Sequence, residues 1–353
     1  METQRLKNVL IGPATIDKQQ IIWARSFVTA TVAGLLVFLC ILTDNKSAAI
    51  PLAIGAAFVG LTNFGEHRVN QMRSMAWCTI WLFVTSLIGG LVSNLGFAQI
   101  PFAMVIAMLA GFAGALGRRG ALIGVLALVL FTVFSGAPDT EISALQTALL
   151  VVAGGVVQLL VASLIAFAAG SIHPLENPES IAQRLTRHRN RESEFARHAL
   201  RLAIAIGVAT AIGQGFGWPH DYWIPMTVVW MSKPSRDGTT TRVIERMVGT
   251  IAGIGVSVIL VDHLGTGDLR FVVFVAAGTL LLLAFINANY PIAVVGITLV
   301  VVALFALNGD PVTPTADYRV ASTLVAALIT IAASFLFPGR NRNQHSQRQS
   351  DTH

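Results

Sequence analysis

The chain has 353 residues, of which 54% are hydrophobic and 12% are charged, and its mean hydropathy is +0.69. A soluble domain carries about 25% charged residues, so this composition excludes a soluble globular protein and indicates a membrane protein. The net charge of +6 is compatible with nucleic-acid binding, but the positions of the charges argue against it. Cys40 and Cys78 lie in apolar runs and predict neither a disulfide framework nor a metal site.

Residues 1–20 are polar and lack a cleavable signal pattern, so they are expected to stay in the cytoplasm. Two groups of six apolar segments follow, separated by a charged cytoplasmic linker at 171–198. The first group is expected at 21–43, 48–64, 74–94, 98–117, 120–136 and 144–170, and the second at 199–217, 221–233, 247–262, 270–287, 290–308 and 319–337. A polar cytoplasmic tail covers 338–353. The lengths and the absence of strict alternation predict an all-α polytopic protein with about twelve transmembrane helices.

The charges of the connections predict the orientation. If the N-terminus is cytoplasmic, almost all lysines and arginines fall in cytoplasmic connections, and the outer connections hold only Lys46, Arg270 and Arg319. Acidic residues such as Asp44 and Asp268 fall in the outer connections instead. This positive-inside pattern predicts a multi-pass protein of the bacterial inner membrane, surrounded by lipid and with both termini in the cytoplasm. It also explains the basic composition without a nucleic-acid partner.

The two halves, 21–170 and 199–337, resemble each other. Pro51 matches Pro225 and Arg68 matches Arg242, and each pair is 174 residues apart. Because each half has an even number of segments, both would enter the membrane in the same direction. The pattern predicts a parallel repeat, with a pathway near a pseudo-twofold axis along the membrane normal.

The apolar segment at 221–233 is too short to span a bilayer, which needs about 20 residues. If it starts at the outer surface, Lys233 lies roughly 17 Å deep in a core of about 30 Å. Pro234 cannot continue the helical hydrogen bonds, so the helix is expected to break there. Pro225 and Pro51 are expected to mark similar structural breaks.

Basic residues follow this break and suggest an anion site. The predicted substrate-binding cations are Lys233, Arg236, Arg242, Arg246, Arg68 and Arg73. A guanidinium group suits a carboxylate because its fork binds both oxygens. The alternative is that these side chains snorkel or anchor the protein at the cytoplasmic surface.

Two aromatic residues at the start of the same segment, Tyr222 and Trp223, also have two interpretations. They could stack on an aromatic substrate, or they could anchor the outer membrane interface. No aspartate or glutamate lies in the middle of any segment, where a proton relay would be expected. The sequence has no phosphate-binding loop, zinc signature or nucleophile–base arrangement, so we expect no enzyme, no cofactor and no metal.

Residues 222–253 resemble the fusaric acid resistance and aromatic acid exporter family. The matching positions are Tyr222, Trp223, Pro225, Lys233, Pro234, Arg242, Arg246, Gly249, Thr250 and Gly253. The resemblance implies export of aromatic or other organic acids through the bacterial inner membrane, with a periplasmic adaptor protein as a partner. It also implies kinship with plant aluminium-activated malate transporters, which pair six-helix subunits around a positively charged pore.

Together these observations predict an inner-membrane transporter that exports organic acids, aromatic carboxylic acids above all, driven by the proton motive force. A passive organic-anion channel or uniporter is the first alternative, because no intramembrane carboxylate is present. A non-transporting envelope scaffold is the second. The sequence leaves the oligomeric state open, a homo-oligomer included.

Overall fold

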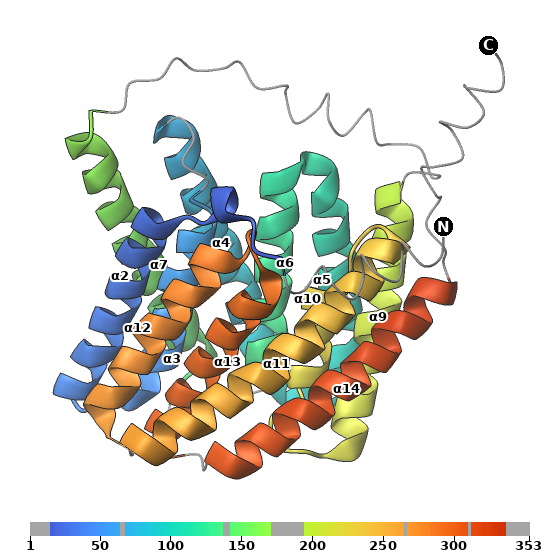
Figure 1. The fold of residues 1–353 in the computed structure, drawn as a ribbon. Helices are drawn as coiled ribbons and strands as arrows, with labels where there is room; N and C mark the ends of the chain where they lie inside the picture. Colours follow the sequence, from blue (N-terminus) through green and yellow to red (C-terminus); the bar gives the residue numbers. More distant parts are fainter. Residues whose placement is uncertain are drawn as a thin grey trace.

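The computed structural model describes residues 15–63, 68–136, 142–170, 194–264, 267–309 and 312–336. In these ranges the chain forms helices and no strands, so the predicted all-α class is confirmed (Figure 1). The first half holds α2 (Trp23–Leu42), α3 (Ala49–Leu61), α4 (Arg68–Val92), α5 (Ile100–Ala113), α6 (Arg118–Gly136) and α7 (Ala144–Ala168). The second half holds α9 (Glu194–Phe216), α10 (Trp223–Met231), α11 (Arg236–Leu264), α12 (Asp268–Phe285), α13 (Tyr290–Leu307) and α14 (Val312–Leu336).

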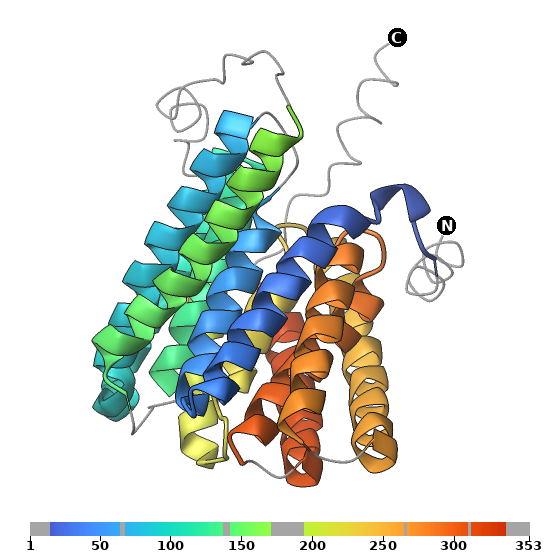
Figure 2. The same ribbon diagram turned by 90° about the vertical axis from the view of Figure 1, so that its left-hand side faces the viewer.

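The helices run roughly along one direction, and successive helices alternate up and down. As a result, the start of α2 and the end of α14 lie at the same end of the bundle (Figure 1). Seen from the side, α2 lies between α7 and α12, so elements of the two halves are neighbours there (Figure 2). Most of the expected N-terminal segment (1–14 of 1–20), most of the linker (171–193 of 171–198) and the tail lie outside the described residues.

Within the described ranges, nine stretches are long and apolar enough to cross a membrane. One of them, Val69–Leu116, contains both α4 and α5. By contrast α3 has 13 residues and α10 has nine, fewer than the roughly 20 that a bilayer requires. The prediction of a multi-pass membrane protein is therefore confirmed, whereas helix length alone does not establish twelve complete crossings.

Several helices begin earlier than the apolar segments do. Helix α4 starts at Arg68 rather than residue 74, α11 at Arg236 rather than 247, and α14 at Val312 rather than 319. Hydropathy marks only the part of a helix that suits lipid, and the backbone continues its hydrogen bonding through the polar turns beyond. With 29 residues, α11 is roughly 43 Å long, more than the thickness of a bilayer core.

Glycines let some helices approach very closely. A Cβ atom added at Gly55 on α3 would lie 2.1 Å from the carbonyl oxygen of Val151 on α7. One added at Gly249 on α11 would lie 2.6 Å from the carbonyl oxygen of Pro291 on α13, and Gly253 packs against the same helix. The GxxxG spacing of Gly249 and Gly253, which is typical of close helix packing, therefore marks a close helix crossing here.

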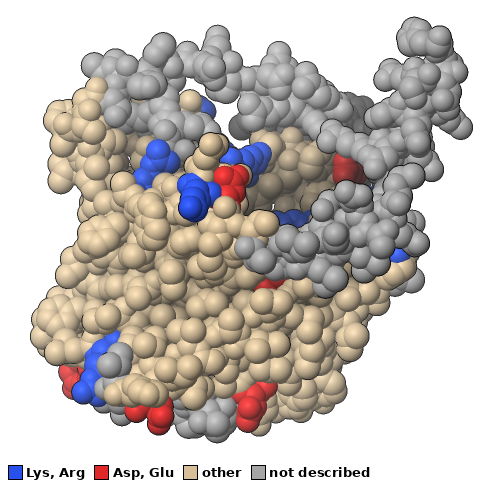
Figure 3. All heavy atoms as spheres, in the orientation of Figure 1, with Lys and Arg blue, Asp and Glu red and all other residues tan. Residues whose placement is uncertain are grey.

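Acidic side chains occupy the end of the bundle opposite to the start of α2. Asp44 follows α2, Asp262 lies near the end of α11, and Asp268 starts α12. Figure 3 shows red groups along this lower edge, with blue groups mainly at the opposite end. Here the ammonium group of Lys46 lies 2.8 Å from the carboxylate of Asp268, which joins the α2–α3 connection to the second half.

Candidate functional site

The short helix α10 lies in the interior of the bundle. All nine of its residues are buried, and it packs against α6, α9 and α14. An apolar surface on every side suits such a position. Pro225 and Pro51 are each the third residue of their helices. A proline is tolerated in the first turn, whose N–H groups lack intrahelical partners, so the expected breaks at Pro225 and Pro51 are wrong.

Lys233 and Pro234 lie in the connection between α10, which ends at Met231, and α11, which begins at Arg236. Arg201 of α9 fixes this connection from the side. Its Nη2 atom donates a hydrogen bond to the carbonyl oxygen of Lys233, and it lies 3.2 Å from the carbonyl oxygen of Pro234. The hydroxyl oxygen of Thr239 accepts from the Lys233 N–H at 3.1 Å. The chain therefore stops one helix and starts another with its backbone groups bonded.

The position of Lys233 differs from the depth expected from sequence. Because α11 is long enough to cross a bilayer and starts after Lys233, this residue lies at the edge of the spanning region rather than past its midplane. Burial lowers the pKa of the Lys233 ammonium group to about 8; the nearby Arg242 lowers it as well, and Glu245 opposes this. Lys233 is thus a half-buried cation at the mouth of the bundle.

The other predicted cations make distinct contacts. The Arg236 guanidinium lies 3.7 Å from the ring centroid of Phe335. That of Arg242 lies 3.3 Å from the ring centroid of Tyr290 and 3.3 Å from the carboxylate of Glu245. Both residues therefore have aromatic partners, which suits a weakly hydrated guanidinium.

The first-half arginines do not join this group in the described contacts. Arg73 is exposed on α4, and its Nη2 atom donates to the side chain of Asn70 at 3.1 Å. Arg68 begins α4, but its side chain lies outside the described residues. Their assignment as substrate ligands stays a prediction.

Two fully buried arginines lie deeper. Arg246 on α11 is 0% exposed and Arg319 on α14 is 1% exposed. Arg246 donates to the hydroxyl of Tyr290 at 3.3 Å, and the Arg319 guanidinium lies 5.0 Å from the ring centroid of Trp223. The expected outer-loop position of Arg319 is wrong, because α14 begins seven residues before it. One feature of the sequence sets Arg319 apart: it is one of the few basic residues in the predicted outer connections, which carry acidic residues instead.

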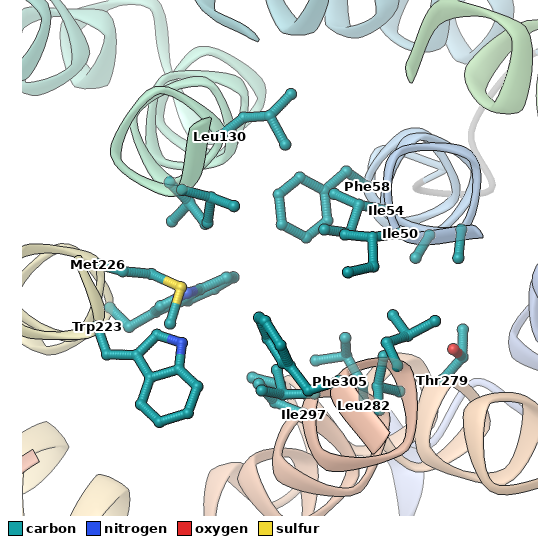
Figure 4. Close-up of a pocket in the computed structure, with 18 of the residues that line it drawn as sticks. Ile50, Ile54, Phe58, Leu130, Trp223, Met226, Thr279, Leu282, Ile297 and Phe305 are labelled. Carbon is teal, nitrogen blue, oxygen red and sulfur yellow. The ribbon is translucent and has the colours of Figure 1, made fainter. Parts of the chain in front are cut away.

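An apolar cavity of about 100 Å³ lies where the two halves meet. Its walls come from α3, α6, α10, α12 and α13 (Figure 4). Phe58 of α3 projects into the cavity, and Trp223 of α10 borders it. Phe305 of α13 lies on the opposite side from Phe58. The lining side chains are almost entirely apolar, so this cavity suits a hydrophobic group and not an ion.

Tyr222 and Trp223 are part of this wall rather than of the surface. They are 4% and 1% exposed, so their interpretation as interface anchors is wrong. The Trp223 ring stacks on His220, with centroids 4.6 Å apart, and meets Phe305 edge-on at 5.8 Å. The polar turn that precedes α10 folds inward, which hydropathy alone does not indicate.

Comparisons with known proteins point to the second half. Residues 207–333, a little more than a third of the chain, match the family described as fusaric acid resistance protein-like. A protein of Escherichia coli named "Inner membrane protein YccS" is 34% identical over 156 residues, which are 44% of this chain and 22% of that protein. An uncharacterized protein of Haemophilus influenzae is 33% identical over 148 residues, 42% of this chain and 20% of the relative. An uncharacterized protein of Neisseria gonorrhoeae is 28% identical over 150 residues, 42% of this chain and 36% of the relative.

The matched part thus covers only a fifth to about a third of the length of these relatives. No solved structure matches the chain. The matched residues contain α10, α11, α12 and α13, the buried Arg246 and Arg319, and the cavity walls that α10, α12 and α13 form. Residues 207–333 are accordingly similar to the fusaric acid resistance protein-like family and to a protein named for the inner membrane.

Proposed function

We propose that this chain forms the membrane part of an inner-membrane transporter that moves organic acids with an apolar body out of the cytoplasm. The observation that carries the proposal is the apolar cavity at the junction of the two halves, with Trp223 shared between its wall and the guanidinium of Arg319. A hydrophobic chamber beside a buried cation suits an amphipathic anion, because each part of the substrate meets its own kind of surface.

The size of the cavity agrees with a small aromatic acid. An apolar protein cavity of about 150 Å³ can hold benzene, and this one measures about 100 Å³. Met226 lies on its wall, and a flexible methionine can move aside at little cost. A single ring therefore fits after a modest rearrangement.

We further propose that the halves are parallel repeats and that the cavity marks their pseudo-twofold axis. Helix α10 starts 174 residues after α3, the offset that also separates the paired prolines. The packing supports this relation: α2–α3 corresponds to α9–α10, α3–α7 to α10–α14, and α4–α6 to α11–α13. Across the halves, α5 packs on α9 and α12 packs on α2, which is the reciprocal pattern of a twofold interface.

This arrangement supports an alternating mechanism in which the halves rock about the cavity. The opposite directions of successive helices and the acidic end of the bundle support cytoplasmic termini and an outer face at Lys46 and Asp268. The outward direction is inferred from the family resemblance. The name of the Escherichia coli relative, which places that protein in the inner membrane, supports the proposed location.

A passive uniporter or channel is the second candidate. One observation favours it: among the described residues, the buried charged side chains are arginines, namely Arg201, Arg246 and Arg319. A proton-coupled carrier usually has a buried carboxylate or histidine as a relay. A proton motive force can still drive such a protein through the membrane potential, because a moving organic anion carries charge.

The test uses the full chain in proteoliposomes loaded with radiolabelled benzoate. We expect protein-dependent efflux that is faster for benzoate than for formate and is abolished by Ala57→Phe, since Ala57 lines the cavity. Leu109→Phe, an exposed position on α5, is the control and should transport normally. Efflux that responds to membrane potential but not to a pH gradient would identify the uniporter. Equal, slow leakage with and without protein would refute the transport proposal and favour a scaffold.

A further inference from the structure

We infer that Arg246 and Arg319 form a buried binding site for one small monovalent anion of carboxylate type, inside the second half between α11 and α14. The inference rests on the proposed function in one respect, because the anion can be the carboxylate of the transported acid. A free small anion offers the same chemistry, and the experiment below distinguishes the two sources.

Most of the guanidinium nitrogen atoms of Arg246 and Arg319 lack a hydrogen-bond acceptor within the described part of the chain. Among the buried side-chain atoms of the described residues, Nε, Nη1 and Nη2 of Arg319 have no hydrogen-bond partner, and neither do Nε and Nη2 of Arg246. Guanidinium groups almost never remain buried in this condition, because leaving a charged donor unbonded costs more than leaving a neutral one. The site therefore lacks an acceptor.

Arg246 and Arg319 carry like charges on two helices that pack together, and the two charges repel each other. Both side chains are at most 1% exposed. No carboxylate is among the buried side chains of the described residues. The nearest acid of α11, Glu245, is already paired with Arg242. Water could accept the hydrogen bonds, but it carries no charge, whereas a buried ion needs a compensating one.

Hydroxyl groups accompany the two arginines on α11, α13 and α14. Tyr290 accepts a hydrogen bond from Arg246, and its own O–H can donate to an anion. Thr250 lies one turn after Arg246 on α11, and Ser322 lies one turn after Arg319 on α14. Both hydroxyl oxygens are buried without a partner, and the two helices pack together. Hydroxyls and guanidinium forks are the groups that bind a carboxylate.

The geometry also limits the ligand. The ring of Trp223 links the site to the apolar chamber, because it borders the chamber and its centroid lies 5.0 Å from the Arg319 guanidinium. A headgroup of carboxylate size fits such a place, whereas a phosphate with two charges and a larger shell suits an open site better. An acid whose ring occupied the chamber would direct its carboxylate past Trp223.

The experiment measures the thermal unfolding midpoint of the purified full chain in detergent, titrated with sodium formate or sodium benzoate. We expect wild type to gain roughly 5 °C near saturation with formate. Arg319→Met and Arg246→Met should lose this gain. Arg270→Met, an exposed arginine at the start of α12, is the matched control and should keep it. Arg319→Lys retains the charge without the fork and should bind formate at least tenfold more weakly.

Benzoate and the filled cavity distinguish the sources of the anion. If Ala57→Phe abolishes the benzoate response but keeps the formate response, the site is the carboxylate subsite of the transported acid. If formate and benzoate act alike in wild type and in Ala57→Phe, the site binds a free small anion.

Two results would overturn the inference. In the first, neither salt raises the unfolding midpoint of wild type more than that of Arg319→Met. In the second, Arg319→Met is more stable than wild type and responds to formate as wild type does. If Arg319→Met does not accumulate, the comparison of Arg319→Lys with Arg270→Met decides. Benzoate efflux that persists while both anion responses are absent would reject the anion site and leave the transport proposal intact.

Discussion

The guanidinium group of Arg201 on α9 donates a hydrogen bond to the carbonyl oxygen of Lys233, at the point where α10 stops. The same nitrogen reaches the carbonyl oxygen of Pro234 at 3.2 Å, and Arg201 is buried. Lys233 and Pro234 lie between the end of α10 and the start of α11, where backbone carbonyl groups have no regular helical partners. Arg201 donates to both carbonyl groups, so it holds the interruption in the conformation that lets α11 begin at Arg236.

Arg201→Met is therefore expected to lower the free energy of unfolding by about 1–3 kcal/mol, because buried carbonyl groups would lose their donor. Thermal unfolding of the purified chain measures this change. Arg201→Lys keeps the charge and should lose less. Arg236→Met is the control, because Arg236 is half-buried and lies over a ring rather than on backbone carbonyls. A stability of Arg201→Met equal to that of wild type would show that water replaces the guanidinium.

The crossing of α3 and α7 should tolerate no added atom. A Cβ at Gly154 would lie 2.1 Å from the carbonyl oxygen of Leu52, and a backbone atom cannot move aside as a side chain end can. Gly154→Ala should destabilise the protein by about 3 kcal/mol, at the upper end of overpacking effects. Gly255→Ala on α11 is the matched control, since nothing lies within 4 Å of its added Cβ. Equal melting of both variants would contradict the close crossing.

Much of the fold could be predicted from the sequence. The apolar segments, the interruption near Pro234 and the small-residue spacing at Gly249 and Gly253 depend on local chemistry, and local chemistry is visible in a single sequence. The helix starts at Arg236 and Val312 were not visible, because a polar turn at a membrane surface has the composition of a loop.

The site was less predictable. The distance of Lys233 from the segment start predicts a position past the midplane, but the length of α11 places it at the mouth. The sequence pattern predicts a loop position for Arg319, which is buried, because burial of a charged residue depends on neighbours from other helices. Contacts such as that between Arg319 and Trp223 join residues almost a hundred positions apart, and no local pattern encodes them.

Lys233 gives the mouth of the bundle a pH-dependent charge. Its pKa is lowered to about 8, mainly by burial, so the ammonium group is charged below pH 8 and becomes neutral as the pH rises through that value. The charged groups near it are Arg201, Arg242 and Glu245, and the imidazole of His198 also lies nearby. Anion uptake from the cytoplasmic side should therefore weaken about two- to tenfold between pH 7 and pH 9, because the attraction of one positive charge is lost.

This dependence on pH is tested by the initial rate of benzoate uptake from the cytoplasmic side of the protein, measured in proteoliposomes at fixed membrane potential. Lys233→Arg stays charged throughout and should flatten the profile, because a guanidinium does not titrate in this range. Lys233→Met should be slow at both pH values. A profile in Lys233→Arg as steep as that of wild type would assign the pH dependence to another group.

The last prediction concerns the size of the cavity. Met226 lies on its wall, so Met226→Ala should enlarge the chamber and admit acids with two fused rings. We expect the ratio of naphthoate to benzoate efflux in proteoliposomes to rise at least fivefold, while stability falls by about 2–4 kcal/mol because a buried side chain is truncated. Met247→Ala on α11 is the matched control, since Met247 packs in a different cluster and does not line the cavity. If both variants change the ratio equally, the chamber does not select the substrate, and general loosening of the bundle explains the effect.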